Sequence, residues 1–193
     1  MPSRLGVFGG TFDPPHHGHL MVASDAFEAL ALDRLLFVPA AEPPHKPQGV
    51  RATTEQRLRM LRAATQTDSR FAVDTAEVDR GGASYTVDTL RELGAREPDA
   101  ELVFLLGIDQ FRALAGWREP QEVARLARLG VLSRGGESPD LSGHYPGIHV
   151  AVRRVDISST EIRERVATER PFRHLVPEGV WRIIEAEGLY RPT

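Results

Sequence analysis

The sequence predicts an α/β fold, in which a doubly wound, mostly parallel sheet carries helices on both faces. The apolar run Leu5–Phe8 is followed by a turn and a helical pattern, which together make a strand–loop–helix unit. Leu35–Val38 and Leu102–Leu106 are continuous apolar runs, as expected for parallel strands buried on both faces. Because such runs alternate with helical patterns, we predict a Rossmann-like fold in a single domain, 1–193, on which a helical portion from about 157 packs.

The first half of the chain contains two expected helices. The first runs from about Gly18 to Leu32, and its predicted buried stripe is Leu20, Ala23, Phe27 and Leu30. The second begins at Thr53, which forms a Thr-x-x-Gln capping box with Gln56. The apolar residues Leu58, Leu61 and Ala64 are expected to be buried on this helix. Its solvated face is predicted to carry Arg57, Arg59 and Arg62.

The second half continues the alternation of strands and helices. Short strands are expected at Phe71–Val73 and Ala76–Val78, and Ser84 is expected to cap a helix over Tyr85–Leu93 that Gly94 ends. The most apolar strand, at 102–106, is placed at the centre of the sheet. The remaining expected elements are a helix from Pro120, strands at Gly130–Leu132 and Ile148–Val152, and helices from Ser158 and Pro177.

Composition excludes several classes of protein. The formal net charge of −3 argues against wholesale binding to nucleic acid or membranes. The absence of cysteine excludes disulfides, thiol catalysis and thiolate metal sites. No apolar run approaches ~18 residues, so we expect neither a signal peptide nor a membrane span. The interpretation is a cytoplasmic protein, either a monomer or a homo-oligomer.

The stretch Gly9–His19 is typical of a phosphate site. Gly9 and Gly10 let the loop backbone approach a ligand closely. His16 and His19 lie where the loop becomes a helix, and free N–H groups there favour an anion. An imidazole donates a hydrogen bond when neutral and adds charge when protonated. The glycine spacing matches neither the dinucleotide fingerprint nor the P-loop.

Other interpretations of this loop stay open. His16 and His19 could bind zinc with Asp13 as a third ligand, although zinc usually takes a fourth. We favour a site without a protein-bound metal. Asp13 is as compatible with hydrogen bonds that hold the turn as with substrate contact. His17 is expected to be a solvent-facing neighbour.

Lys46 is the only lysine among the 24 Lys and Arg residues. Its proline-rich loop leaves the carboxyl end of the second strand, so Lys46 and His45 can face the same ligand as the first loop. A lone lysine suggests that a compact ammonium is needed there, but its survival by chance is equally compatible with the sequence.

A second motif, Ile157–Arg163, starts the helix near the C-terminus. Ser158 is followed by Glu161 at capping-box spacing, which explains a helix start by local physics alone. Ser159, Thr160 and Arg163 share one side of its first turn, so hydroxyls and a guanidinium fork could bind phosphates there. Capping with a surface arginine is the alternative.

Three segments between the motifs also carry candidate ligand-binding residues. Gly107 and Asp109 follow the central strand, where a carboxylate commonly accepts from ribose hydroxyls; an N-cap is the other role for Asp109. Trp117 lies in a loop, and an indole there suits ring stacking. Tyr85 and Thr86 begin a helix whose N-terminus is open to an anion.

The two motifs resemble the signatures of the nucleotidyltransferase superfamily, Gly-Thr-Phe-Asp-Pro-x-His-x-Gly-His and Ile-Ser-Ser-Thr-x-Ile-Arg. The segments Ser84–Leu90 and Gly107–Asp109, together with Trp117 and the loop 43–46, resemble bacterial nicotinate-nucleotide adenylyltransferases over nearly the whole chain. The resemblance implies ATP and nicotinate mononucleotide as substrates, with Mg²⁺ carried by ATP. The catalytic residues that it implies are His16, His19, Lys46 and Arg163. Implied ATP contacts are Gly9, Gly10, Thr11, Phe12, His16, His19, Gly107, Asp109, Ser158, Ser159, Thr160 and Arg163; implied substrate contacts are Tyr85, Thr86, Trp117 and Lys46.

The predicted chemistry is direct displacement at the α-phosphate of ATP. The sequence shows no serine–histidine triad and no carboxylate cluster, so catalysis is expected to come from positioning and charge stabilisation. The rival families fit less well. A phosphopantetheine adenylyltransferase is usually shorter and has Thr in place of His16, whereas cytidylyltransferases usually carry Arg-Thr-x-Gly-Ile-Ser-Thr-Thr as the second motif. A non-enzymatic nucleotide-binding regulator would be expected to lack His19 or Arg163.

Overall fold

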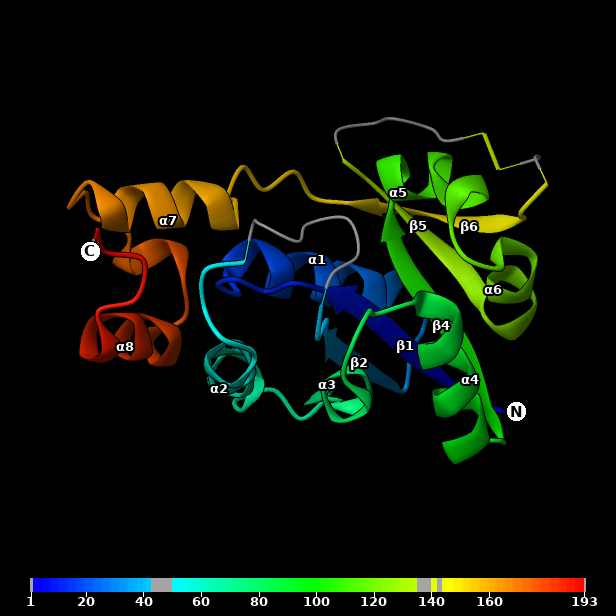
Figure 1. Cartoon of the computed structure of the whole chain (residues 1–193). Coiled ribbons are helices and arrows are strands. Elements are labelled where there is room, and N and C mark those ends of the chain that lie inside the picture. The colour runs from blue at the N-terminus through cyan, green and yellow to red at the C-terminus, as the bar shows by residue number, and fades with distance from the viewer. Residues whose placement is uncertain (1, 43–49, 135–139, 142–143, 193) are drawn as a thin grey trace.

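The fold is built on a parallel sheet. The computed structural model describes residues 2–42, 50–134, 140–141 and 144–192. Within them a six-stranded sheet has the order β3-β2-β1-β4-β5-β6, and each neighbouring pair is parallel (Figure 1). The strands are β1 (Ser3–Gly10), β2 (Arg34–Pro39), β3 (Phe71–Val73), β4 (Ala100–Gly107), β5 (Arg128–Arg134) and β6 (Gly147–Val152). The predicted fold class is confirmed.

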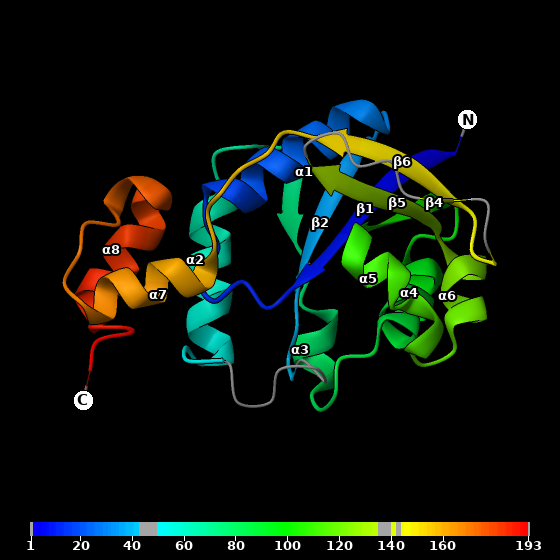
Figure 2. The same cartoon turned by 90° about the horizontal axis from the view of Figure 1, so that it is seen from above.

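Helices cover both faces of this sheet. The α-helices are α1 (His17–Ala29), α2 (Thr54–Thr65), α3 (Ala76–Arg80), α4 (Thr86–Arg96), α5 (Ile108–Arg112), α6 (Pro120–Leu126), α7 (Ser159–Ala167) and α8 (Glu178–Glu187), with short 3₁₀ turns η1 (Leu114–Gly116) and η2 (Arg173–Leu175). Helix α1 lies on one side of the sheet and α4 on the other (Figure 2). Within the described residues, no helix is long and apolar enough to cross a membrane.

Strand side chains alternate between the two cores. In β2, Leu35 and Phe37 pack on the side of α1 and α2, whereas Leu36 and Val38 pack on the side of α4 and α6. Both sets are buried, which explains why this strand is a continuous apolar run. β4 pairs with both β1 and β5, so its predicted central position is confirmed.

A third core joins the C-terminal helices to α2. Met60 and Ala64 of α2 share this cluster with Ile162 of α7 and with Val180 and Ile184 of α8. Figures 1 and 2 both place α7 and α8 beside α2, beyond the edge of the sheet. The cluster therefore holds the second motif at a defined distance from the start of α2.

Three local predictions in the middle of the chain were wrong. Residues 76–78 form helix α3 and not a strand, because the side chain of Asp74 accepts from the Ala76 amide and starts a turn. The next helix has Tyr85 as its N-cap, and the Ser84 hydroxyl instead accepts from Ala41 N–H at 2.9 Å. This helix also runs past Gly94 and ends before Pro98, since the residue preceding proline disfavours the helical conformation.

The buried faces of the first two helices also differ from the predictions. Of the predicted stripe of α1, Ala23 and Leu30 are buried, whereas Leu20 and Phe27 are half-buried. The other buried residues of the helix are Gly18, Val22 and Ala26, and the helix ends at Ala29. The capping box of α2 is confirmed. Arg57, however, is 1% exposed instead of solvated. Its spacing to Leu61 and Ala64 places it on the buried stripe of α2.

Candidate active site

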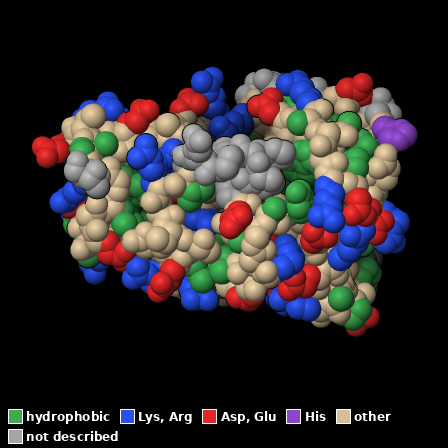
Figure 3. Space-filling model, in the orientation of Figure 1, with side chains coloured by type: hydrophobic (Ala, Val, Ile, Leu, Met, Phe, Trp, Pro, Cys, Tyr) green, Lys and Arg blue, Asp and Glu red, His purple; other side chains and the backbone are tan. Residues whose placement is uncertain are grey.

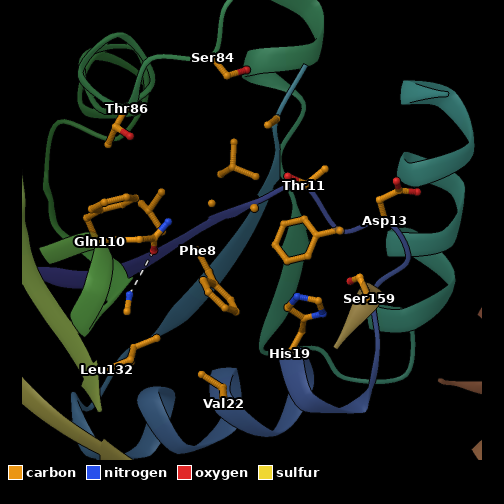
Figure 4. Close-up of a pocket in the computed structure, with 18 of the residues that line it drawn as sticks. Phe8, Thr11, Asp13, His19, Val22, Ser84, Thr86, Gln110, Leu132 and Ser159 are labelled. Carbon is orange, nitrogen blue, oxygen red and sulfur yellow. Dashed lines mark hydrogen bonds between the residues drawn. The ribbon is translucent and has the colours of Figure 1, made fainter. Parts of the chain in front are cut away.

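A cleft of about 900 Å³ opens at the carboxyl ends of β1 and β4. The strand order reverses between these two strands, which is where doubly wound folds bind ligands. Figure 4 shows Thr86 and Gln110 on one side of this cleft and Thr11, His19 and Ser159 on the other. The predicted site residues that line it are Gly9, Gly10, Thr11, Phe12, His16, His19, Tyr85, Thr86, Gly107, Trp117, Ser158, Ser159, Thr160 and Arg163.

The loop after β1 takes its shape from an aromatic ring. Phe12 has a φ of 50°, in the left-handed region, and its side chain is only 2% exposed. Its ring lies over Gly10, where a Cβ atom would come within 2.8 Å of it. The ring also makes edge contacts with Phe37 and His19. Gly10 is therefore required for packing as well as for close approach to a ligand.

The two histidines of the first motif form a stacked pair. His16 is the N-cap of α1, and its ring stacks on that of His19 with centroids 3.7 Å apart. The His16 backbone N–H donates to Nδ1 of His19 at 3.2 Å, so the proton of a neutral His19 ring is on Nε2. A Cβ at position 18 would lie 2.9 Å from His16 Nδ1, which explains Gly18 in the motif.

Both imidazoles are held neutral at pH 7. Burial, together with smaller electrostatic contributions from Arg134 and His17, lowers the pKa of His16 to about 4. Burial, His16 and Arg134 lower the pKa of His19 well below its ordinary value. Of the two roles that the sequence allowed, the structure favours the neutral hydrogen-bond donor. Arg134 and Arg163 supply fixed positive charge to the cleft.

Asp13 holds neighbouring segments together. Its carboxylate is 2% exposed and accepts from the Arg51 and Ala52 amides at 2.7 and 3.2 Å and from the Tyr190 hydroxyl at 2.7 Å. Burial and Asp13 raise the pKa of Tyr190. These contacts turn the carboxylate away from His19 (Figure 4). In the described part of the chain, no three His, Asp or Glu side chains are grouped to hold a metal ion.

The second motif closes on the first. Ser158 caps α7, since its hydroxyl accepts from the Glu161 amide at 3.1 Å. The Ser159 hydroxyl donates to the Pro14 carbonyl at 2.8 Å. Arg163 donates through Nη1 to the Asp13 carbonyl at 2.8 Å. The capping explanation and the site explanation therefore both hold for this turn, and one end of the Arg163 fork is used to fix the loop.

The far end of the cleft is lined by the start of α4 and by the loop after η1. Trp117 is half-buried and packs edge-on against Phe104, with the two ring centroids 6.2 Å apart. Its indole is therefore less exposed than that of a tryptophan in an open loop. The Arg118 guanidinium lies 4.7 Å from the Tyr85 ring centre. Glu77 is a buried carboxylate of the same wall, and burial raises its pKa although the Thr89 and Ser84 hydroxyls oppose that shift.

Among the described residues, one predicted site residue, Asp109, is not brought into the cleft. The Asp109 side chain is 93% exposed, lies 3.6 Å from Arg112 and does not line the cleft. Its N-cap alternative is wrong, because Gly107 is the N-cap of α5. Lys46 lies outside the described residues, as does His45. His17 is half-buried and does not line the cleft.

Sequence reasoning missed Arg134 and Arg57, as well as Arg118, which lines the far end of the cleft. Arg134 lines the cleft as the last residue of β5, and the rule that ligands bind at the carboxyl ends of parallel strands could have found it. Arg57 lies behind the first loop, where its guanidinium donates to the Thr11 carbonyl at 2.9 Å. The sequence did indicate this burial, because Arg57 is spaced to lie on the same face of the helix as the apolar residues Leu61 and Ala64.

The fold and the cleft are those of an α/β protein of the nucleotidyltransferase class. The cytidylyltransferase-like family model matches residues 7–165. A protein of Thermus thermophilus named as a probable nicotinate-nucleotide adenylyltransferase is 46% identical over 188 residues, covering 97% of this chain and 100% of the relative. One of Geobacillus thermodenitrificans with the same name is 44% identical, covering 97% and 86%. The chain therefore belongs to the nicotinate-nucleotide adenylyltransferase family, as the sequence predicted.

A solved structure supports the fold. The nicotinic acid mononucleotide adenylyltransferase of Plasmodium falciparum, in complex with APC, has a TM-score of 0.79 and covers 97% of both chains. At 18% identity, this likeness concerns the fold alone.

The neutral histidines make stability depend on pH. His16 titrates at 6.5 when unfolded and at about 4 when folded, so between these values the unfolded chain binds more protons and stability falls as the pH is lowered. From pH 7 to pH 5 this costs about 2 kcal/mol. Between pH 7 and pH 5 we expect the free energy of unfolding of His16→Asn to fall by about 2 kcal/mol less than that of the wild type. Urea unfolding at both pH values measures this difference. His174→Asn, at an exposed histidine, is the control, and equal losses in wild type and His16→Asn would contradict the expectation.

Proposed function

We propose that this chain transfers the adenylyl group of ATP to nicotinate mononucleotide, giving nicotinate adenine dinucleotide and pyrophosphate. The observation that carries the proposal is the closure of the two motifs over one cleft, through Ser159 and Arg163 on the carbonyls of Pro14 and Asp13. The names of the relatives support the choice of substrates. The reaction is a step of NAD biosynthesis.

The triphosphate is proposed to lie against the first loop and the start of α7. Gly9 to Phe12 bring backbone close to the phosphates, and the neutral His16 and His19 rings offer N–H donors without adding charge. Ser158 to Thr160 present hydroxyls, and Arg163 and Arg134 present cations. These are the groups expected for stabilising charge on a transferring nucleotidyl group.

The proposed step needs no protein nucleophile. An acceptor phosphate oxygen attacks the α-phosphorus of ATP, the bond from that phosphorus to the bridging oxygen breaks, and pyrophosphate leaves. The protein aligns the two substrates and stabilises the charge that grows on the leaving group. The cations Arg134 and Arg163 and the His19 N–H are proposed to do this.

Mg²⁺ is proposed to enter with ATP. Magnesium prefers oxygen ligands, and in enzymes it is usually bound by one or two carboxylates together with the phosphates of the substrate. In the described part of the cleft Asp13 is already occupied by three donors, and Glu77 lies in the other wall. The phosphate oxygens are therefore the main ligands proposed for the ion, which when bound neutralises part of their charge.

The acceptor is proposed to bind at the start of α4. A nicotinate carboxylate gains from the free N–H groups at Thr86, where an uncharged nicotinamide would not. The pyridine ring is proposed to stack on Trp117, with Tyr85 beside it, which contributes ~1 kcal/mol. Lys46 and the ribose role of Asp109 stay predictions from the sequence.

The proposed activity is tested by incubating the purified protein with Mg-ATP and one acceptor at a time, while pyrophosphate is measured. Nicotinate mononucleotide should be used with the highest kcat/KM, ahead of nicotinamide mononucleotide. Phosphopantetheine should release no pyrophosphate. Turnover with phosphopantetheine, or none with nicotinate mononucleotide, would sink the proposal.

His19→Ala should lower kcat by ~10², on the order of 3 kcal/mol, because it removes a donor to the charge that develops on the phosphates. Steady-state kinetics measure the effect, and unfolding curves establish that the variant is folded. His17→Ala is the matched control, since that ring lies outside the cleft. Near-normal turnover by folded His19→Ala would remove His19 from the mechanism.

Trp117→Ala should raise the KM for nicotinate mononucleotide more than the KM for ATP, because the stacking partner of the pyridine ring is lost. Trp117→Phe keeps an aromatic face and should recover most of the affinity. The comparison requires both KM values for each variant. A defect confined to ATP would reassign Trp117 to the adenine.

A further inference from the structure

Arg57 is a buried cation that the proposed reaction does not use. Its side chain is 1% exposed, and it heads the fully buried side chains of the described residues by size. Its guanidinium donates to the Thr11 carbonyl at 2.9 Å, the Ala41 carbonyl at 3.2 Å and the Thr54 hydroxyl at 3.0 Å. All three acceptors are neutral, and within the described residues no carboxylate pairs directly with it and Nε is buried without a partner.

Such a group is costly to bury. A buried charge is unfavourable unless it is both paired with an opposite charge and hydrogen-bonded, and arginine keeps its proton even in this environment. Burial lowers the pKa of Arg57, while the charges of Asp13 and Tyr190 oppose the shift. Met60 and Leu61, one turn along the same helix, fill comparable positions with apolar side chains. The explanation for an arginine must therefore lie in the groups that it binds.

The decisive partner is the Thr11 carbonyl. In a planar trans peptide the C=O and the following N–H point in opposite directions, so drawing Thr11 C=O to Arg57 turns the Phe12 N–H away from Arg57. Thr11 and Phe12 line the cleft, whereas Arg57 does not. The left-handed φ of Phe12 belongs to this same peptide orientation and costs about 1 kcal/mol.

We propose that Arg57 is a positioning residue for the triphosphate: it holds the Thr11–Phe12 peptide so that its amide faces the phosphates. The inference rests on the proposed binding of ATP in this cleft. Arg57 never touches the nucleotide and acts through the loop. The Ala41 contact ties the end of β2 to the same guanidinium, so the loop after β1 and the start of the loop after β2 are held at one fixed separation.

The proposal is tested with Arg57→Met, which removes the charge and the fork, and with Arg57→Lys, which keeps the charge but cannot span three acceptors. Calorimetry should give a dissociation constant for ATP at least tenfold higher in Arg57→Met and intermediate in Arg57→Lys. The KM for nicotinate mononucleotide should change less than twofold. Arg62→Met, an exposed arginine of the same helix, is the matched control and should bind ATP as the wild type does.

A series of nucleosides separates positioning from a general loss of structure. If Arg57 positions a phosphate-binding amide, the weakening should be large for ATP, smaller for AMP and absent for adenosine. Equal weakening for ATP and adenosine, or unchanged ATP affinity in either variant, would overturn the inference. If wild-type protein itself binds ATP no better than adenosine, the proposed function fails instead, so the two failures are distinguishable.

Discussion

The cleft depends on two hydrogen bonds between segments far apart in sequence. Ser159 and Arg163 donate hydrogen bonds to the backbone carbonyls of Pro14 and Asp13. Both carbonyls lie in the loop after β1, so their hydrogen-bond donors come from another segment of the chain. Tyr190 adds a third link from the C-terminus to the Asp13 carboxylate. Docking of α7 and α8 therefore helps to fix the loop after β1, and both helices share a core with α2.

Charge in the cleft is divided between neutral donors and fixed cations. The His16 and His19 rings are stacked and buried, so both stay neutral near pH 7 and their N–H groups are held in one orientation. Arg134 and Arg163 bring guanidinium groups to the lining of the same cleft. Outside the cleft, Figure 3 shows basic and acidic side chains mixed over the face in view, so the positive charge there is not part of a broad patch on that face.

The two ends of the cleft are held by different parts of the sheet. The end proposed for the triphosphate is lined by β1, α1 and α7, whereas the end proposed for the acceptor is lined by α4 and by the segment after β4. Ser84 joins the acceptor end to the strand ends, since its hydroxyl and amide bond to Ala41 and Glu42. A parallel sheet with a reversal of strand order brings these separate supports together. Substrate alignment is thus set mainly by the sheet and its helix starts.

The sequence by itself determined the fold class, both motifs and most of the cleft, because strand runs, caps and glycine loops are encoded by residues close together in the chain. The tertiary structure decided the outward side chain of Asp109, and it established the burial of Arg57 and the entry of Arg134, for which the sequence carried only indirect signals. Residues 76–78 became a helix through a local Asp74 turn that a short apolar run does not reveal. The protonation of the histidine pair also required the fold, since burial and a neighbouring cation from another strand set both pKa values.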